Sequence, residues 1–171
     1  PEKVDTFQFL RKFFGINSTG ITMEKVLRNK NIISCYEKLD GSLCGFVYID
    51  GVIRVRTSND IAVFEGDKDF SGQRDRRPSP VASMIQEYYE QDDKLKGFVK
   101  EALDAGFTPA FEYQSLENMI VVDVSEVSLK LIQMRDPQGK YVDIHNHELV
   151  KKYDIVCADS FEYSLDELLS L

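Results

Sequence analysis

Alternating apolar and polar positions predict a group of strands in the first third of the chain. From Ile32 the pattern changes to three short apolar runs, "IISCYEK", "LCGFVYI" and "VIRVRTS". Asp50 and Gly51 separate the last two runs, and an Asp-Gly pair favours the positive φ angles of a tight hairpin turn. We therefore expect three antiparallel strands over residues 32–58.

A polar stretch and then a helical pattern follow these strands. Residues 64–80, "FEGDKDFSGQRDRRPSP", contain two glycines and two prolines and are predicted to form a mobile loop. Apolar residues then recur at helical spacing from Val81 to Leu103, and Gly106 stands where a C-cap glycine is expected.

The remainder of the chain is predicted to consist of strands followed by short helices. The strand-like runs are "FTPAFEYQ", "NMIVVDV", "SLKLIQMR" and, after the turn "DPQG", "KYVDI". Helices are inserted between groups of strands and do not alternate with them, so we predict an α+β fold with a mainly antiparallel sheet. A chain of 171 residues with 43% hydrophobic residues can bury one good core, and we expect a single domain over 1–171.

Charge and cysteine content restrict the function classes. The chain has 21 Lys and Arg against 29 Asp and Glu, a net charge of −8, so any contact with nucleic acid must be local. Three cysteines, Cys35, Cys44 and Cys157, are too few for a disulfide framework and fit a reducing compartment. No apolar run approaches the length of a membrane span, and the N-terminus lacks the regions of a signal peptide. We expect a soluble, cytoplasmic protein without a membrane partner, located in the host cytoplasm if it is viral.

The segment "EKLDGSL", residues 37–43, carries candidate chemistry. Lys38 ends an apolar run, and a lysine amine becomes a nucleophile when desolvation or positive neighbours lower its pKa. Asp40 and Gly41 are expected to turn the chain, Gly41 leaves room for a ligand, and Ser42 can donate to an oxygen. K-x-D-G arises by chance in roughly a few per cent of chains this long, so an ordinary surface turn is the alternative.

This segment resembles the K-x-D-G lysine motif shared by ATP-dependent ligases and RNA capping enzymes. Its extended form is most similar to the bacteriophage RNA ligase 1 family. Three further segments also resemble that family: "RKFFGIN" at 11–17, "YIDGVIRVRTS" at 48–58 and "GFTPAFEYQSLENMIVV" at 106–122. The order and spacing of these segments agree with those of the family over most of residues 8–143.

The resemblance implies the adenylyltransferase (nucleotidyltransferase) domain of an ATP-dependent ligase and a set of site residues. Lys38 would be the nucleophile that becomes Lys-AMP. The ATP-binding residues would be Lys12, Phe14, Glu37, Asp40, Gly41, Arg56 and Glu112.

Individual roles within this set also follow from the resemblance. Lys12 would reach the triphosphate, Arg56 would contact phosphate, and Glu112 would lie near the ribose hydroxyls. Releasing pyrophosphate requires cations, which Lys12, Arg56 and a Mg²⁺ ion could supply. The alternatives are solvated side chains for the two cations and a core position for Phe14.

The function that the resemblance implies is an ATP-dependent RNA ligase of the RNA repair type. AMP would pass from Lys38 to an RNA 5′-phosphate, and a 3′-hydroxyl would then displace AMP. A non-catalytic nucleotide-binding or regulatory remnant is the second hypothesis, and a DNA ligase or capping nucleotidyltransferase is a weaker alternative.

Departures from the family pattern support the remnant hypothesis for the isolated chain. Leu116 replaces a proline, Met119 replaces an arginine, and the later E-G-[YF]-V and K-x-K strands of the family are not found. We therefore expect a truncated adenylyltransferase domain that is weakly active or inactive alone.

Two other motifs have plain interpretations. "HNH" at 145–147 resembles a metal or nuclease site, but a turn into the helix "HELVKKY" is the better prediction, because no third ligand is near. "QRDRRPS" at 73–79 is the densest positive cluster and could bind RNA, although a solvated loop is the default.

Overall fold

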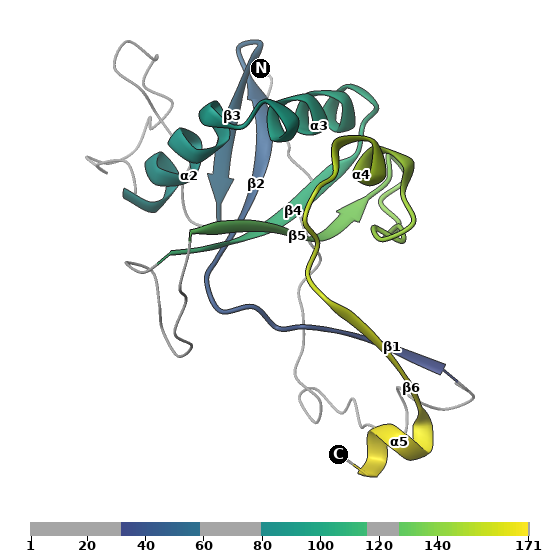
Figure 1. The fold of residues 1–171 in the computed structure, drawn as a ribbon. Coiled ribbons are helices and arrows are strands. Elements are labelled where there is room, and N and C mark those ends of the chain that lie inside the picture. The colour runs from purple at the N-terminus through teal and green to yellow at the C-terminus, as the bar shows by residue number, and fades with distance from the viewer. Residues whose placement is uncertain (1–31, 59–79, 116–126, 171) are drawn as a thin grey trace, which may run out of the picture. The chain divides into compact units, whose positions relative to one another are not determined.

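The computed structural model describes residues 32–58, 80–115 and 127–170 (Figure 1). Lys12, Phe14, the predicted strand "NMIVVDV" and the predicted loop up to residue 79 lie outside the described residues. The elements, with the labels of Figure 1, are β1 Ile32–Tyr36, β2 Ser42–Ile49, β3 Val52–Thr57, α2 Pro80–Gln91, α3 Asp93–Asp104, β4 Thr108–Gln114, β5 Ser128–Arg135, α4 Glu148–Tyr153, β6 Ser160–Ser164 and α5 Leu165–Ser170.

Internal contacts divide the chain into two units. Of the described residues, the sheet unit contains 39–58, 80–115 and 127–157, and the ribbon unit contains 32–38 and 158–170. The prediction of a single, truncated domain stays a prediction. The mixture of helices and antiparallel strands confirms the predicted α+β class.

The sheet unit contains a four-stranded antiparallel sheet in the order β3-β2-β4-β5. The predicted hairpin between β2 and β3 is confirmed, because Asp50 and Gly51 have φ angles of 49° and 80° and Ile49 pairs with Val52. β4 and β5 pair from Thr108 to Gln114, with an irregularity between Ala110 and Phe111.

The prediction that the first strand belongs to the same sheet as the next two is wrong. Residues 32–36 do form a strand, but β1 pairs with β6 in a separate two-stranded sheet, with Ile32 opposite Ser164 and Tyr36 opposite Ser160. A strand has two edges, and both edges of β2 are occupied, by β3 and by β4. No edge of β2 is left for β1, so the three strands predicted over residues 32–58 do not form one continuous antiparallel sheet.

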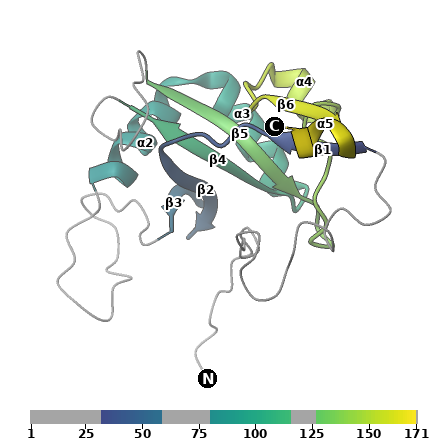
Figure 2. The same cartoon turned by 90° about the horizontal axis from the view of Figure 1, so that it is seen from below.

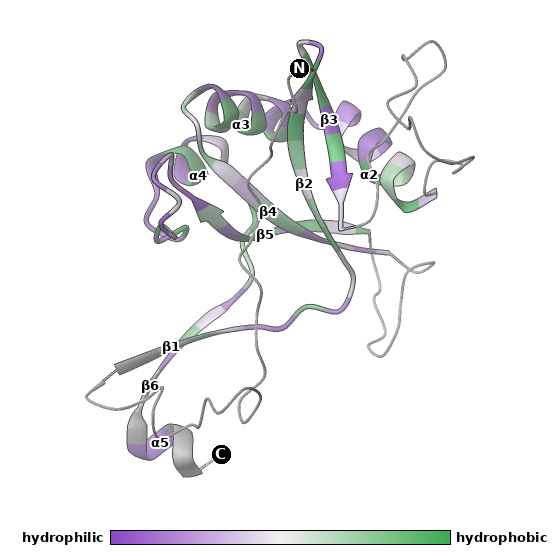
Figure 3. Ribbon diagram, turned by 180° about the vertical axis from the view of Figure 1, so that it is seen from behind, coloured by the Kyte–Doolittle hydropathy of each residue, from purple (hydrophilic) through white to green (hydrophobic). Residues whose placement is uncertain are grey.

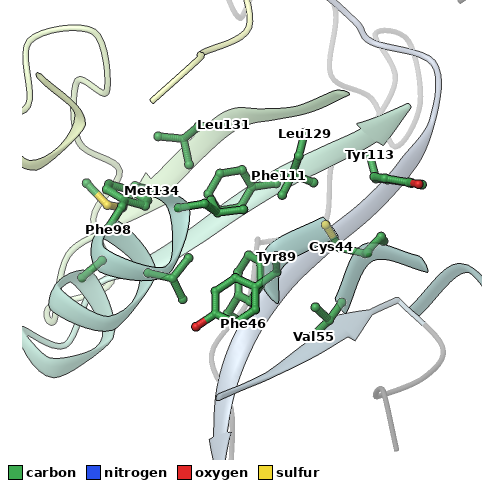
Figure 4. Packing of buried hydrophobic residues seen from close by; sticks show 14 of the residues in the cluster. Cys44, Phe46, Val55, Tyr89, Phe98, Phe111, Tyr113, Leu129, Leu131 and Met134 are labelled. Carbon is green, nitrogen blue, oxygen red and sulfur yellow. The ribbon is translucent and has the colours of Figure 1, made fainter. Parts of the chain in front are cut away.

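One face of the four-stranded sheet forms the hydrophobic core with α2 and α3, which lie on the same side of the sheet (Figures 1 and 2). Burying each large apolar side chain contributes about 1.5–3 kcal/mol. Phe111 is central, with its ring 5.6 Å from that of Phe46 and 6.1 Å from that of Phe98, both edge to face (Figure 4). Other buried members from the strands and helices are Cys44, Val55, Leu129, Leu131, Ile85, Val99 and Ala102.

The predicted helical stretch is divided into two helices. Asp92 lies between them with φ −108°, and its carboxylate accepts a hydrogen bond from the Leu95 amide at 3.0 Å. This is the N-cap arrangement that begins a new helix. The predicted end is confirmed, because Gly106 has φ 79° and follows the C-cap Ala105.

The exposed edge of the sheet is covered by a glutamine of α2. β3 is the end strand among the described residues, so no described strand pairs with its outward amides and carbonyls. Gln86, which is fully buried, accepts from the Val55 amide at 2.8 Å and donates to the Ile53 carbonyl at 3.5 Å. Its amide also donates to Glu90 at 2.8 Å.

The segment after β5 contains one prediction that is confirmed and one that is wrong. The turn "DPQG" is confirmed, since the Gly139 amide donates to the Asp136 carbonyl at 2.8 Å. The predicted strand "KYVDI" is reduced to a single bridge between Arg135 and Tyr141. The chain there enters the turns that lead to α4, and Asn146 donates to Asp143 at 2.8 Å within them.

The "HNH" motif is the start of a helix, as predicted. His147 is the N-cap of α4 and accepts from the Leu149 amide at 3.3 Å. Over residues 32–58, 80–115 and 127–170, no group of three His, Cys, Asp or Glu side chains could hold a metal ion. In the same ranges, no helix is long and apolar enough to cross a membrane.

Candidate functional site

Predicted site residues occupy the sheet face opposite the core. Side chains alternate along a strand, so Arg56 and Glu112 lie on the face opposite to Val55 and Phe111. β3 accordingly shows hydrophobic and hydrophilic segments in Figure 3. The backbone of Gly45 pairs with Arg56 on one side and with Ala110 on the other. The cationic Arg56 of the edge strand and the acidic Glu112 of an inner strand therefore lie on one face of the sheet, with β2 between their strands.

Glu112 has a cationic neighbour that the sequence analysis did not single out. Lys130 on β5 stands directly opposite Glu112 in the β4–β5 register. Side chains opposite each other in antiparallel strands have Cβ atoms about 4.5–5.5 Å apart, so opposite charges at these positions attract. The alternation of polar and apolar residues in "SLKLIQMR" predicts that Lys130 faces away from the core. It does not predict that Glu112 is the neighbour of Lys130, which only the β4–β5 register shows.

A pocket of about 390 Å³ lies at the end of this sheet, where β2 begins and β3 ends. This volume is within the range of about 300–1,000 Å³ that is usual for ligand pockets. Glu112 supplies a carboxylate, and Ser42, Thr57 and Ser58 supply hydroxyl groups to the lining. The lining residues are Gly41, Ser42, Leu43, Thr57, Ser58, Val81 and Glu112.

A second pocket, of about 450 Å³, lies at the junction of α2 and α3 and contains none of the predicted site residues. We base the site on the first pocket, although it is the smaller, because it joins Gly41 and Glu112 from two separate sequence motifs. Arg56 immediately precedes Thr57 of its lining.

Gly41 is required by the packing of the chain. A Cβ atom at this position would lie 2.2 Å from the Tyr113 carbonyl oxygen and 3.2 Å from Cγ of Gln114. No side chain fits against a backbone carbonyl at that distance. The sequence analysis expected this glycine to make room for a ligand, but the neighbour that needs the space is the backbone of β4.

The segment before Gly41 is attached to the end of β4 by a side chain. Gln114, only 8% exposed, donates from Nε2 to the Asp40 carbonyl oxygen at 3.2 Å. Ser128 on β5 donates to Oε1 of the same glutamine at 3.4 Å. Gln114 was not predicted from the sequence as a site residue, because nothing in "FEYQS" distinguishes a buried glutamine from a surface one.

Lys38 and Glu37 belong to the ribbon unit. The Glu37 amide donates to the Asp159 carbonyl at 2.9 Å and so extends the pairing of β1 with β6 by one residue. Lys38 is exposed. The structure thus brings together Gly41 and Glu112 in one pocket and holds Asp40 beside it, while Lys38 and Glu37 are described in the other unit.

The antiparallel sheet with helices on one face has the fold of solved ATP-dependent RNA ligases. An archaeal ATP-dependent RNA ligase matches with a TM-score of 0.55 over 82% of this chain and 34% of its own, at 13% identity. A Naegleria gruberi RNA ligase variant, solved with ATP and Mn, matches with a TM-score of 0.53 over 80% of this chain and 38% of its own, at 14% identity.

The sequence comparison identifies the family. The RNA ligase family model matches residues 7–167, and this chain belongs to that family. A Thermovibrio ammonificans protein named "Putative RNA ligase" is 28% identical over 132 residues, which are 77% of this chain and 30% of that protein. The chain therefore spans about a third of the length of the relatives that it matches.

Proposed function

We propose that this chain is the nucleotide-binding part of an ATP-dependent RNA ligase and that Lys38 accepts AMP from ATP. The observation that carries the proposal is that Gly41 and Glu112, from two motifs far apart in the sequence, line one pocket of suitable size. Membership of the RNA ligase family supports the choice of substrate, an RNA with 5′-phosphate and 3′-hydroxyl ends. The ATP complex of the Naegleria gruberi enzyme supports the choice of nucleotide.

In the proposed first step, the neutral Nζ of Lys38 attacks the α-phosphorus of ATP. A nitrogen–phosphorus bond forms, the bond to the bridging oxygen breaks, and pyrophosphate leaves with the bonding electrons. Arg56 offers positive charge to the phosphates, and charge placed in advance is usually the largest contribution to catalysis. Glu112 accepts hydrogen bonds from the ribose hydroxyls.

In the next two steps the AMP group is transferred and released. An oxygen of the RNA 5′-phosphate attacks the phosphorus of Lys38-AMP, and the lysine amine leaves. The RNA 3′-hydroxyl then attacks the activated 5′-phosphate, a phosphodiester bond forms, and AMP leaves.

A divalent metal, expected to be Mg²⁺, would supply positive charge to the triphosphate, as Mn accompanies ATP in the Naegleria gruberi structure. The described residues do not form a site for such an ion by themselves, since they contain no group of three His, Cys, Asp or Glu ligands. Mg²⁺ is commonly held by substrate phosphates and water with only one or two carboxylates. We therefore assign no residue of this chain as its ligand.

The test is direct detection of the covalent intermediate. Stoichiometric protein incubated with labelled ATP and Mg²⁺ should gain one acid-labile AMP at Lys38 and release pyrophosphate. Residues 1–171 contain no E-G-[YF]-V segment followed by a K-x-K segment, so we expect a slow reaction and recommend single-turnover conditions.

Two variants make this test specific. Lys38→Ala should abolish the adduct, whereas Lys140→Ala, which removes an exposed lysine in the turn after β5, should leave it unchanged. An adduct that forms at another lysine, or persists in Lys38→Ala, would refute the proposed function. Binding of ATP without any adduct would favour the alternative of a nucleotide-binding remnant.

A further inference from the structure

We propose that Gln114 is a positioning residue for the nucleophile: it anchors the chain immediately after Lys38 and so limits where the lysine amine can lie. This inference rests on the proposed function, because it assumes that Lys38 is the group that reacts. Gln114 itself is not expected to touch ATP.

The hydrogen bonds of Gln114 define one orientation of its amide. The Asp40 carbonyl can only accept, so the Gln114 nitrogen must be the group that faces it, at 3.2 Å. The Ser128 hydroxyl donates to the opposite end of the amide at 3.4 Å, and Ser128 is also the register partner of Gln114 across β4 and β5. Both polar ends of a nearly buried side chain are therefore used.

The backbone next to Asp40 is held at the same place. Gly41 passes so close to the Tyr113 carbonyl that no Cβ would fit, and Ser42 then starts the pairing of β2 with β4 opposite Tyr113. Leu39, on the other side of Asp40, is buried at 7% exposure. The chain is thus fixed at consecutive residues that begin directly after Lys38.

Anchoring at this point has a kinetic consequence. Reacting atoms must be held close to the geometry of attack, and a displacement of about 1 Å can cost about 100-fold in rate. Loss of the Gln114 anchor should therefore slow the transfer of AMP to Lys38. It should affect the affinity for ATP less, because Gln114 does not line the pocket.

The chain offers a matched control in Gln133 on β5. The Gln133 side chain uses its oxygen, which accepts from the Met134 amide at 2.9 Å. A change of Gln133 to Glu keeps an acceptor there. The same change at Gln114 replaces the amide group that donates to the Asp40 carbonyl with a second acceptor.

The experiment measures the rate of Lys38-AMP formation against ATP concentration for the wild type, Gln114→Glu, Gln114→Leu and Gln133→Glu. Both Gln114 variants should lose about 10- to 100-fold in the rate constant at saturating ATP. The ATP concentration for half-maximal rate should change less than about threefold in both. Gln133→Glu should behave as the wild type. Hydrogen exchange of the amides of residues 40–42 should be faster in the two Gln114 variants than in the wild type. Exchange in α3 should be unchanged, and this pair of results would exclude a global loss of stability as the cause of the slower reaction.

The outcomes separate this inference from the proposed function. A wild-type protein that forms no adduct at Lys38 would refute the proposed function and the positioning role with it. A wild-type adduct together with unchanged rate constants in both Gln114 variants would refute the positioning role alone. The positioning role would also be refuted if the Gln114 variants changed only the ATP concentration for half-maximal rate. It would equally be refuted if their slower reaction were accompanied by faster hydrogen exchange throughout the sheet unit.

Discussion

At the scale of the residue, Glu112 illustrates how one side chain obtains its environment from three strands. It lies on β4 opposite Leu43 of β2 and opposite Lys130 of β5, and it lines the pocket at the end of the sheet. The apolar neighbour and the cationic neighbour lie on opposite sides of the carboxylate. The carboxylate therefore lies next to a cation on the sheet face that leads into the pocket.

The role proposed for Glu112 predicts a change in sugar discrimination. Hydrogen bonds to charged groups contribute about 1.5–3 kcal/mol, so Glu112→Ala should lose about 10- to 100-fold of the preference for ATP over deoxy-ATP analogues. The measurement compares rates of Lys38-AMP formation with ATP, 2′-deoxy-ATP and 3′-deoxy-ATP. Glu148→Ala, at an exposed residue of α4, is the control. Unchanged discrimination in Glu112→Ala would remove Glu112 from the sugar site.

At the scale of the element, the edge of β3 depends on α2. Gln86 takes the place of a missing neighbouring strand, with its amide satisfying both the Val55 amide and the Ile53 carbonyl. Arg56 is the next residue of β3 after Val55. The same contact that completes the sheet edge therefore supports the strand that carries a proposed phosphate ligand.

Removing this contact should destabilise the sheet unit. Gln86→Leu leaves the buried Val55 amide without its acceptor, and a buried unsatisfied donor costs about 1–3 kcal/mol. The free energy of unfolding from urea titration should fall by that amount. Gln91→Leu, the same substitution at an exposed position of α2, should have little effect on it. Equal stability of Gln86→Leu and the wild type would contradict the proposed importance of this contact.

At the scale of the whole molecule, charge limits how RNA can be bound. The net charge of −8 opposes a general attraction to a phosphate backbone. If this chain takes part in RNA ligation as proposed, we expect its RNA contacts to be few and local. The cluster Arg74, Arg76 and Arg77 is one source of positive charge, and it lies outside the described residues.

This charge balance predicts weak binding with a shallow salt dependence. Each phosphate contact to single-stranded RNA contributes about 0.7 to the slope of log affinity against log salt, so a slope below about 3 in magnitude is expected. Fluorescence anisotropy with a 5′-phosphorylated RNA at several salt concentrations measures it. Changing the three clustered arginines to alanine should reduce the slope if they bind phosphate. A steep slope in the wild type would show an extended basic surface that the composition does not indicate.

Local chemistry determined the features that the sequence predicted correctly. The hairpin at Asp50 and Gly51 and the helix end at Gly106 depend on residues that tolerate positive φ, and the N-cap at His147 depends on a polar side chain before a helical pattern. The family was visible because its motifs are short segments in a fixed order. The break at Asp92 is also a local signal, a capping residue within a helical pattern, and could have been recognised in the same way.

Only the tertiary structure decided the pairings between distant segments. β1 pairs with β6 and not with β2, whose two edges are occupied by β3 and β4, and no local sequence pattern shows which strand edges are occupied. The same holds for Lys130 opposite Glu112 and for Gln114 on the Asp40 carbonyl. Gly41 was predicted from the sequence to leave room for a ligand, but the close neighbour, the Tyr113 carbonyl, was not predicted. Each of these contacts joins residues far apart in the chain, so its partner is determined by packing and register, which sequence spacing does not encode.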